Sequence, residues 1–364
     1  MNAEPPGQGR PRPGPAPALV GRALAPIYGL AVRARNRRFD AGRGVRRLPL
    51  PVISVGNLSV GGTGKTPMVA WIVQRLATAG VPPAIAMRGY SPDGRHGPDS
   101  DEALQYRTLA PGVPIAADPD RYAAVTRLLA EPAGAAVRCV VLDDGFQHRA
   151  LARDLDIVLI DATRDPFADR LLPAGWLREP VESLRRAGAV VITHAECAQP
   201  GAVDRIDQCL QRLMDRPADA VVRHAWAGLR LSDPPYDDDH PQPVSWLAGR
   251  RALALCGIGN PGPFIAMSRA ACGSCDVQVF PDHETYAPST VAGAFVRSEA
   301  FFRGAAAHEP VLTTEKDWTK LRTVARGLWS RPVARPVLEL RFDRGERALT
   351  DRVLAAAGAP PAAP

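Results

Sequence analysis

A glycine-rich segment at residues 56–67 (GNLSVGGTGKTP) has the residue types and the spacing that bind a nucleoside triphosphate. Glycines let backbone N–H groups surround phosphate oxygens, and the start of a following helix adds positive potential. In this pattern Lys65 reaches the terminal phosphates, and Thr66 offers its hydroxyl group to Mg²⁺. The predicted nucleotide-binding residues are Ser59, Val60, Gly61, Gly62, Thr63, Gly64, Lys65 and Thr66.

The sequence around this segment has the order that a P-loop requires. The apolar residues 51–55 (PVISV) predict a buried strand before the glycines, and apolar residues recur at helical spacing over residues 68–76. Ser59 stands where the strict G-x-x-x-x-G-K-[ST] pattern has a glycine, so the loop is a variant. A purely structural glycine turn is the alternative, but the order of strand, loop and helix favours phosphate binding.

Two consecutive carboxylates, Asp143 and Asp144, can complete a metal site. They follow the mostly apolar residues 137–142, which predict a buried strand that ends at the sheet edge where ligands bind in such folds. Asp-Asp-Gly is also an ordinary turn sequence. After a P-loop strand we favour a magnesium site made of Thr66, Asp143 and Asp144, so that ATP and Mg²⁺ are the expected cofactors.

The elements that must position these residues alternate between short β-branched runs and helical stretches. Buried strands are predicted at residues 52–55, 84–87, 137–142, 157–160 and 189–193, with helices near 67–79 and 120–131. A second series of strands begins near residue 221. This pattern predicts an α/β fold: a P-loop NTPase-like, doubly wound parallel sheet lobe and a second, smaller α/β lobe, preceded by an N-terminal amphipathic helix.

We expect five segments along the chain. They are a disordered tail at 1–18, an amphipathic helix with a basic segment at 19–48, a P-loop lobe at 49–220, a C-terminal α/β lobe at 221–350 and a flexible tail at 351–364.

Composition excludes several broad classes of protein. The 364 residues are 46% apolar and 23% charged, with a mean hydropathy of −0.12, which argues against a disordered chain and against a multi-span membrane protein. The net charge of +7 is concentrated in residues 1–50, which carry +8, while the remaining chain carries −1. A general nucleic-acid footprint is therefore not expected. The start of the chain has no pattern of a cleavable signal, and we expect reduced, cytosolic cysteines.

The basic N-terminal region also has an apolar stripe. Val20, Leu24 and Ile27 recur at helical spacing, and arginines flank them. Such a helix is suited to lie in a membrane interface, with cations near anionic headgroups. A first helix that packs on the protein core, with a solvated basic end, is the alternative that the pattern leaves open.

Several separated blocks resemble one known family. They are GNLSVGGTGKTP, DDGFQHRALARDLDIVLIDA at 143–162, LLPAGWLREP at 171–180, FPDHETY at 280–286 and TTEKDWTKL at 313–321. In this order, over about residues 17–343, they resemble the tetraacyldisaccharide 4′-kinases, the lipid A 4′-kinases. The resemblance implies transfer of the γ-phosphate of ATP to the 4′-hydroxyl of a tetraacylated disaccharide 1-phosphate. It also implies an active site between two lobes, at the cytoplasmic face of the bacterial inner membrane.

The resemblance also assigns residues to roles. It implies that Asp101 acts on the acceptor hydroxyl with help from His283, that Lys65 is catalytic and that Asp143 binds Mg²⁺, with Asp144 adjacent. Further active-site positions, with lower weight, are Tyr90, Glu102, Arg121, Gln147 and Glu179. The acylated lipid and the membrane surface are the expected partners, without nucleic acid and without an obligate protein partner. Ser100 replaces a glycine of the family, which affects the loop before Asp101.

Three other interpretations compete. A deviant P-loop membrane-switch or partitioning ATPase also fits GGTGKT, but that class expects a lysine where this chain has Val60. The G-x-G-x-x-G match at residues 257–262 is an isolated match, and we favour a strand-to-helix turn over a dinucleotide site. Cys272 and Cys275 form a single CxxC without a second ligand pair, which favours packing over zinc or redox chemistry.

Overall fold

The computed structural model describes residues 14–89, 101–281, 284, 286–287, 289–290, 292–293, 301–304, 308–326 and 329–360. The chain divides into two compact units. Unit 1 consists of Met1–Arg88, Gly112–Arg223 and Phe342–Pro364, and unit 2 consists of Gly89–Pro111 and His224–Arg341. The α/β fold with a largely parallel sheet agrees with the predicted fold class.

The strands of unit 1 are parallel and lie in the order β6-β5-β1-β4-β2-β3. Their bounds are β1 Val52–Asn57, β2 Pro83–Met87, β3 Ile115–Ala117, β4 Cys139–Asp143, β5 Leu155–Asp161 and β6 Ala189–Thr193. Every residue of β1, β2, β4 and β6 is buried, as expected for parallel strands that are covered on both faces. All five strands predicted in this region are confirmed.

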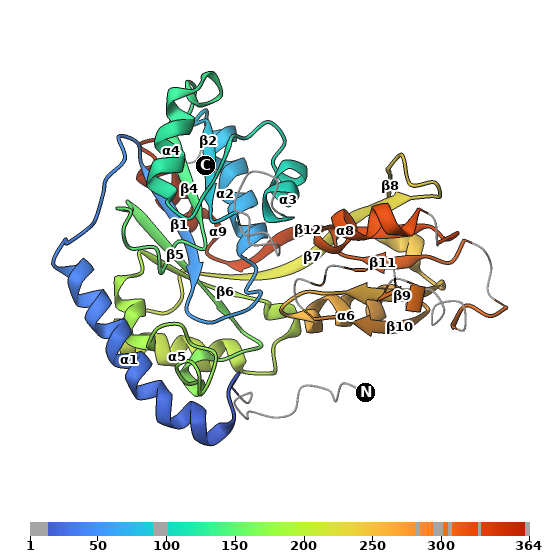
Figure 1. Cartoon of the computed structure of the whole chain (residues 1–364), viewed down its shortest axis with the longest axis horizontal. Coiled ribbons are helices and arrows are strands. Elements are labelled where there is room, and N and C mark those ends of the chain that lie inside the picture. The colour runs from blue at the N-terminus through green and yellow to red at the C-terminus, as the bar shows by residue number, and fades with distance from the viewer. Residues whose placement is uncertain are drawn as a thin grey trace. The chain divides into compact units, whose positions relative to one another are not determined.

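Helices cover both faces of these strands. The helices of unit 1 besides the N-terminal one are α2 Lys65–Thr78, α4 Arg121–Ala130, α5 Ala202–Met214 and α9 Glu346–Ala356. One apolar core joins α5 to β5 and β6, and another joins α4 to β2 and β4. Figure 1 shows α2 and α4 toward the top of this unit and α5 toward the bottom, with the strands between them.

Unit 2 has its own strands and cores. Its strands are β8 His240–Gln242, β9 Arg251–Cys256, β10 Ser274–Val279 and β11 Val311–Thr313, together with most of β7 Ala220–Ser232 and β12 Val333–Arg344. They follow the order β10-β9-β11-β12-β7-β8. The helices α3 Asp101–Leu109, α6 Pro261–Ala271 and α8 Glu315–Ala325 belong to this unit. Two clusters of buried apolar side chains form its interior.

The predicted domain boundaries differ from these units in several places. Residues 221–223 and 342–350, which we expected in the C-terminal lobe, belong to unit 1. Residues 89–111, which we expected in the P-loop lobe, belong to unit 2. The predicted flexible tail at 351–364 overlaps α9, whose Leu349, Val353 and Leu354 are buried. These side chains recur at helical spacing, and α9 contacts α2, β1 and β5, so the C-terminal region returns to the first unit.

The N-terminal helix α1 (Ala18–Asp40) is continuous through Pro26. Gly21, Gly29 and Val32 form its buried side. Its apolar side chains on other faces are exposed: Leu19, Val20, Leu24, Ile27 and Leu30. Within the described part of the chain, no helix has the length and apolar character needed to cross a membrane.

Candidate active site

The predicted phosphate-binding loop lies between β1 and α2. The strand ends at Asn57 and the helix begins at Lys65, directly after Gly64, which has φ +81°. That left-handed conformation favours glycine, so the residue type is required by the turn itself. Two hydrogen bonds hold the loop from outside: Val60 N–H donates to the Trp176 carbonyl at 2.8 Å, and Thr193 Oγ1 donates to the Thr63 carbonyl at 2.9 Å.

Charged side chains converge beside this loop. Lys65 Nζ lies 3.3 Å from Asp144 Oδ1 and 3.5 Å from Asn57 Oδ1. On its other oxygen, Asp144 accepts a hydrogen bond from Arg178 Nη1 at 2.8 Å. Burial alone would raise the pKa of Asp144, but the charges and hydrogen bonds of Lys65 and Arg178 outweigh it and hold that pKa well below its usual range. Asp144 is therefore an anion that both cations share.

The turn after β4 is packed closely on β1. A Cβ atom on Gly145 would lie 2.4 Å from Ser54 Oγ, and one on Gly56 would lie 2.5 Å from the Cβ atom of Phe146. Asp143 pairs in register with Val55, next to this contact. Because neither glycine can carry a side chain here, the DDG turn is fixed against the strand that leads into the phosphate loop.

Oxygen ligands suited to Mg²⁺ are present around the loop. Asp143 is 7% exposed at the end of β4, and Thr66 is half-buried in the first turn of α2. Within the described residues, Thr63 Oγ1 is a buried hydroxyl oxygen without a hydrogen-bond partner, and buried Asn57 Nδ2 is an unpaired N–H donor that suits a phosphate oxygen. Carboxylate and hydroxyl oxygens are the donors that Mg²⁺ prefers, so the residues fit this ion. Thr66, Asp143 and Asp144 would hold it, and the bound ion would neutralise charge on the transferring phosphate group.

Gln147 links the turn to the phosphate loop. Its Nε2 donates to the Asn57 carbonyl at 2.8 Å, and its Oε1 accepts from Arg178 at 3.5 Å. The structure thus brings the predicted Lys65, Asp144 and Gln147 together with two residues that the sequence did not single out, Asn57 and Arg178. Asn57 is the last residue of β1, directly before the loop, and this position in the sequence could have marked it as a site residue. Arg178 is one of many arginines, and only its contact with Asp144 distinguishes it.

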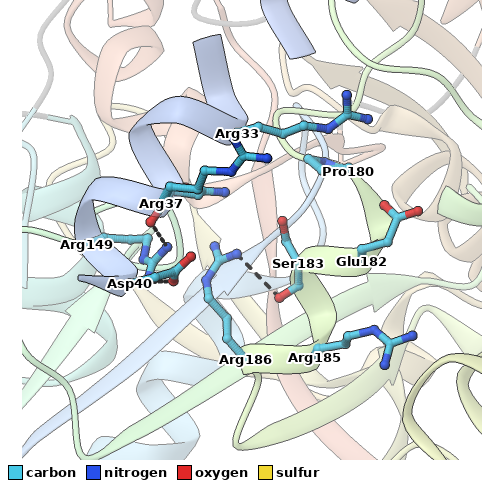
Figure 2. Close-up of a pocket in the computed structure, with 10 residues that line it drawn as sticks. Arg33, Arg37, Asp40, Arg149, Pro180, Glu182, Ser183, Arg185 and Arg186 are labelled. Atoms are coloured by element: carbon cyan, nitrogen blue, oxygen red, sulfur yellow. Dashed lines mark hydrogen bonds and ion pairs between the residues drawn. The ribbon is translucent and has the colours of Figure 1, made fainter. Parts of the chain in front are cut away.

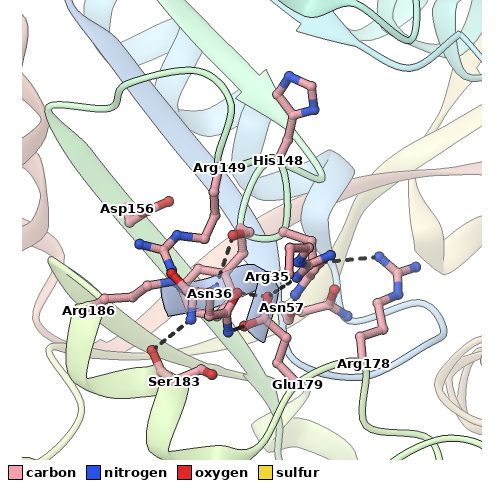
Figure 3. A network of polar contacts seen from close by, with 12 residues as sticks. Arg35, Asn36, Asn57, His148, Arg149, Asp156, Arg178, Glu179, Ser183 and Arg186 are labelled. Carbon is pink, nitrogen blue, oxygen red and sulfur yellow. Dashed lines mark hydrogen bonds and ion pairs between the residues drawn. The ribbon is translucent and has the colours of Figure 1, made fainter. Parts of the chain in front are cut away.

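Glu179 is fully buried and receives three donors (Figure 3). Asn36 Nδ2 donates to it at 2.7 Å, Arg186 at 3.0 Å and Arg35 at 3.2 Å. Two of these donors come from α1, and Tyr28 of the same helix donates its hydroxyl to the Arg178 carbonyl at 2.9 Å. The carboxylate that we predicted at a substrate position therefore also fastens α1 to the segment that carries Arg178.

The remaining predicted residues are placed only in part. Arg121 is buried at the start of α4, where its Nη1 donates to the Pro119 carbonyl at 3.1 Å. Asp101 and Glu102 are the first residues of α3 in unit 2, and the structure describes their backbone but not their side chains. Tyr90 and His283 lie outside the described residues.

The two competing motifs of unit 2 differ in their packing. A Cβ atom on Gly257 would lie 2.7 Å from the Tyr286 hydroxyl oxygen, and Gly257 N–H donates to buried Asp317 at 3.1 Å. The first glycine of the G-x-G-x-x-G match is thus surrounded by its own protein, as in a structural turn. Cys272 and Cys275 are free and half-buried.

A parallel sheet in which a glycine loop joins a buried strand to a helix, with carboxylates at the end of the adjacent strand, defines a P-loop nucleotide-binding protein. Comparison with known proteins gives the particular family. The family model described as tetraacyldisaccharide-1-P 4′-kinase matches residues 18–356, and the chain belongs to this family. The resemblance found in the sequence blocks is thereby confirmed.

Relatives and a solved structure agree with this result. The chain is 37% identical over 350 residues to a tetraacyldisaccharide 4′-kinase of Geobacter sulfurreducens, covering 90% of this chain and 91% of the relative. It is 36% identical over 322 residues to that of Xanthomonas euvesicatoria, covering 84% and 85%. A crystal structure of LpxK from Aquifex aeolicus in complex with ATP has a TM-score of 0.65 at 26% identity, covering 92% of this chain and 98% of that one.

Proposed function

We propose that this chain is an ATP-dependent tetraacyldisaccharide 4′-kinase of lipid A biosynthesis. It transfers the γ-phosphate of ATP to the 4′-hydroxyl of a tetraacyldisaccharide 1-phosphate. Family membership supports the reaction, and the contact of Lys65 with Asp144 beside the glycine loop is the observation that carries the site. A membrane-switch ATPase is not favoured, because the family is a kinase family and Val60 replaces the lysine expected of that class.

The chemistry follows from the demands of phosphoryl transfer. The acceptor oxygen forms a bond to the γ-phosphorus while the bond from that phosphorus to the β–γ bridging oxygen breaks, and ADP leaves. Most of the catalysis is alignment and charge neutralisation, which Lys65 and the loop N–H groups supply. In our assignment Asp101 takes the hydroxyl proton and His283 supports it. Tyr90, Glu102, Arg121, Gln147 and Glu179 are assigned to the acceptor side of the site.

The acceptor carries four acyl chains, so we place the enzyme at the cytoplasmic face of the inner membrane, with α1 as its contact. Leu19 is 84% exposed, Ile27 64% and Leu30 63%. An apolar helical face of this kind can enter the boundary between headgroups and acyl chains. Replacing these three side chains by glutamine is expected to move the protein from the vesicle fraction to the supernatant. Unchanged partitioning would contradict the membrane role of α1.

A label-transfer assay tests the proposed reaction. Purified protein, γ-labelled ATP, Mg²⁺ and the tetraacyldisaccharide 1-phosphate are expected to give labelled lipid. Lys65→Ala and Asp101→Ala are each expected to abolish the label, while the matched control Cys272→Ala keeps it, because Cys272 lies in unit 2 in the CxxC that we assign to packing. Absence of labelled lipid with the unmodified protein would refute the proposal.

A further inference from the structure

One block of the sequence, TTEKDWTKL at 313–321, has no role in the reaction described above. Its Asp317 lies in the first turn of α8 and is only 1% exposed. An aspartate is almost never buried so completely unless other groups compensate its carboxylate. The contacts of Asp317 therefore show which parts of unit 2 this carboxylate joins.

Three donors surround the carboxylate of Asp317. Its Oδ2 accepts hydrogen bonds from Thr314 Oγ1 at 2.6 Å and from Gly257 N–H at 3.1 Å. Its Oδ1 accepts a hydrogen bond from the Tyr286 hydroxyl at 2.9 Å. The donors belong to the cap of α8, the turn after β9 and the FPDHETY block at 280–286. One carboxylate thus ties three segments of unit 2 together.

Asp317 is itself held firmly. Thr314 is the N-cap residue of α8, and its Oγ1 accepts a hydrogen bond from Asp317 N–H at 3.1 Å. The strands β9 and β11 pair in parallel, so Gly257 and Thr314 follow strand ends at the same edge of the sheet (Figure 1). The carboxylate therefore has a fixed position from which to hold the third segment, the FPDHETY block.

Tyr286 is the residue of the FPDHETY block that reaches Asp317. It is 1% exposed and has φ +55°, in the left-handed region that a bulky residue adopts only where its surroundings hold it. Burial, followed by the negative charge of Asp317, raises the pKa of Tyr286 far above its usual range. The hydroxyl group therefore keeps its proton and remains a donor to Asp317.

A second tie joins α8 to the same block. Lys320, one turn after Asp317 and one of three lysines in the chain, donates from Nζ to the Glu284 carbonyl at 3.2 Å. Glu284 N–H donates to the Pro281 carbonyl at 3.2 Å, and Tyr286 N–H donates to Glu284 Oε1 at 3.3 Å. The described residues before and after position 283 are thus linked to one another and to α8.

We propose that Asp317 is a positioning residue for phosphoryl transfer: through Tyr286 it holds the FPDHETY block in the place from which His283 supports Asp101. The inference rests on the proposed function, which assigns His283 and Asp101 to the acceptor hydroxyl. Asp317 does not touch the reacting atoms in this assignment. A supporting imidazole is effective only while its backbone keeps it aligned, and a small misplacement lowers the rate strongly.

Tyr286→Phe tests the proposal, because it removes one donor and leaves Asp317 the other two. The matched control is Tyr236→Phe: Tyr236 lies in the same apolar core, is fully buried, has φ +69° and donates its hydroxyl to the Arg331 carbonyl at 2.8 Å. Each variant loses one buried hydrogen bond, so their melting temperatures should fall by similar amounts. Only Tyr286→Phe is expected to lower kcat for lipid labelling, by about tenfold, with the KM for ATP unchanged.

The same substitution in a His283→Ala background separates positioning from a general loss of structure. If Tyr286 acts through His283, Tyr286→Phe should not lower the single-turnover rate of the His283→Ala protein any further. Equal kcat values for Tyr286→Phe and Tyr236→Phe, or a tenfold loss repeated in the His283→Ala background, would overturn this inference alone. Unmodified protein that labels no lipid would instead refute the proposed reaction, and this inference with it.

Discussion

Two cationic regions of unit 1 differ in whether acidic side chains pair with their cations. Beside the phosphate loop, Lys65 and Arg178 share the carboxylate of Asp144, so the protein already supplies the anion. In the open pocket between α1 and the short helix η3 (Val181–Arg186), which we call the basic pocket, Arg33, Arg37 and Arg185 are exposed and have no acidic partner among the described residues (Figure 2). The difference shows that the cations beside the phosphate loop are fixed by a shared carboxylate, while these exposed arginines of α1 and η3 are compensated by solvent alone.

Short segments connect these regions. Arg178 contacts Asp144, the next residue Glu179 binds α1, and Pro180 lines the basic pocket. In the same way Gln147 faces the phosphate loop and Arg149 lines the pocket. Substitutions in the phosphate-loop region, in the basic pocket and in the segments that join them therefore show whether a change in one region also affects the other.

The largest effect is expected for Lys65→Ala. The ammonium group is the cation that we assign to the terminal phosphates, and losing it should lower kcat at least about 1,000-fold, or about 4 kcal/mol in the barrier. Kinase assays check this result, and vesicle binding should be unchanged, since Lys65 does not belong to α1, which we assign as the membrane contact. A parallel loss of vesicle binding would show that the two regions are not independent.

A smaller effect, on the stability of the fold, is expected for Glu179→Gln. The buried carboxylate joins α1 to Arg186, and removing one member of a buried ion pair typically costs about 3 kcal/mol or more. Urea unfolding measures the change. Exposed Glu182→Gln is the matched control and should change the free energy of unfolding by less than about 0.5 kcal/mol. Equal effects in both variants would mean that Glu179 does not fasten α1.

Asp144→Asn should lower kcat about 100-fold, or about 2.7 kcal/mol, because the charged partner of Lys65 is lost together with a carboxylate that we assign to Mg²⁺. The pKa of Asp144 is held far below its usual range, so Asp144 stays ionised at every pH at which the enzyme is assayed. The variant should therefore keep the acid limb of the pH–rate profile while needing more Mg²⁺. Disappearance of that limb would identify Asp144 as a titrating group.

The smallest effect concerns His148, which lies between Gln147 and Arg149. Burial, followed by the charges of Arg121 and Arg153, lowers the pKa of His148 to about 4. Between pH 4 and 6.5 the unfolded chain binds a proton at this histidine that the folded protein does not. The stability of the folded protein is therefore greatest, as far as His148 is concerned, above pH 6.5, and it falls as the pH is lowered toward 4. Between pH 7 and 5, unmodified protein should lose about 2 kcal/mol more unfolding free energy than His148→Gln. Equal losses would contradict the lowered pKa.

The phosphate loop could be predicted from the sequence because its physics is local. Glycine spacing, a preceding apolar strand and a following helix are contiguous, and the carboxylates of Asp143 and Asp144 follow a recognisable strand. The contacts that complete the region are not local: Arg178 lies 34 residues from Asp144, and Asn36 lies 143 residues from Glu179. No periodic pattern in the sequence predicts contacts between side chains that lie so far apart along the chain.

The C-terminal helix was missed for a related reason. Residues 351–364 are rich in alanine and proline and resemble a tail, but the apolar side chains that begin at Leu349 fill a face of β1 and β5 that only the folded unit creates. The assignment of residues 89–111 to unit 2 likewise depends on α3 packing with α8, more than 200 residues further along the chain. Tertiary packing decides both.

The central claim is tested most directly by following the fate of the γ-phosphate with and without the acceptor lipid. We predict that ATP is consumed only when the tetraacyldisaccharide 1-phosphate is present, and that one phosphomonoester appears on the lipid for each ADP formed. ATP turnover without the lipid, with its phosphate released into solution, would contradict the account and would point instead to a nucleotide-driven switch.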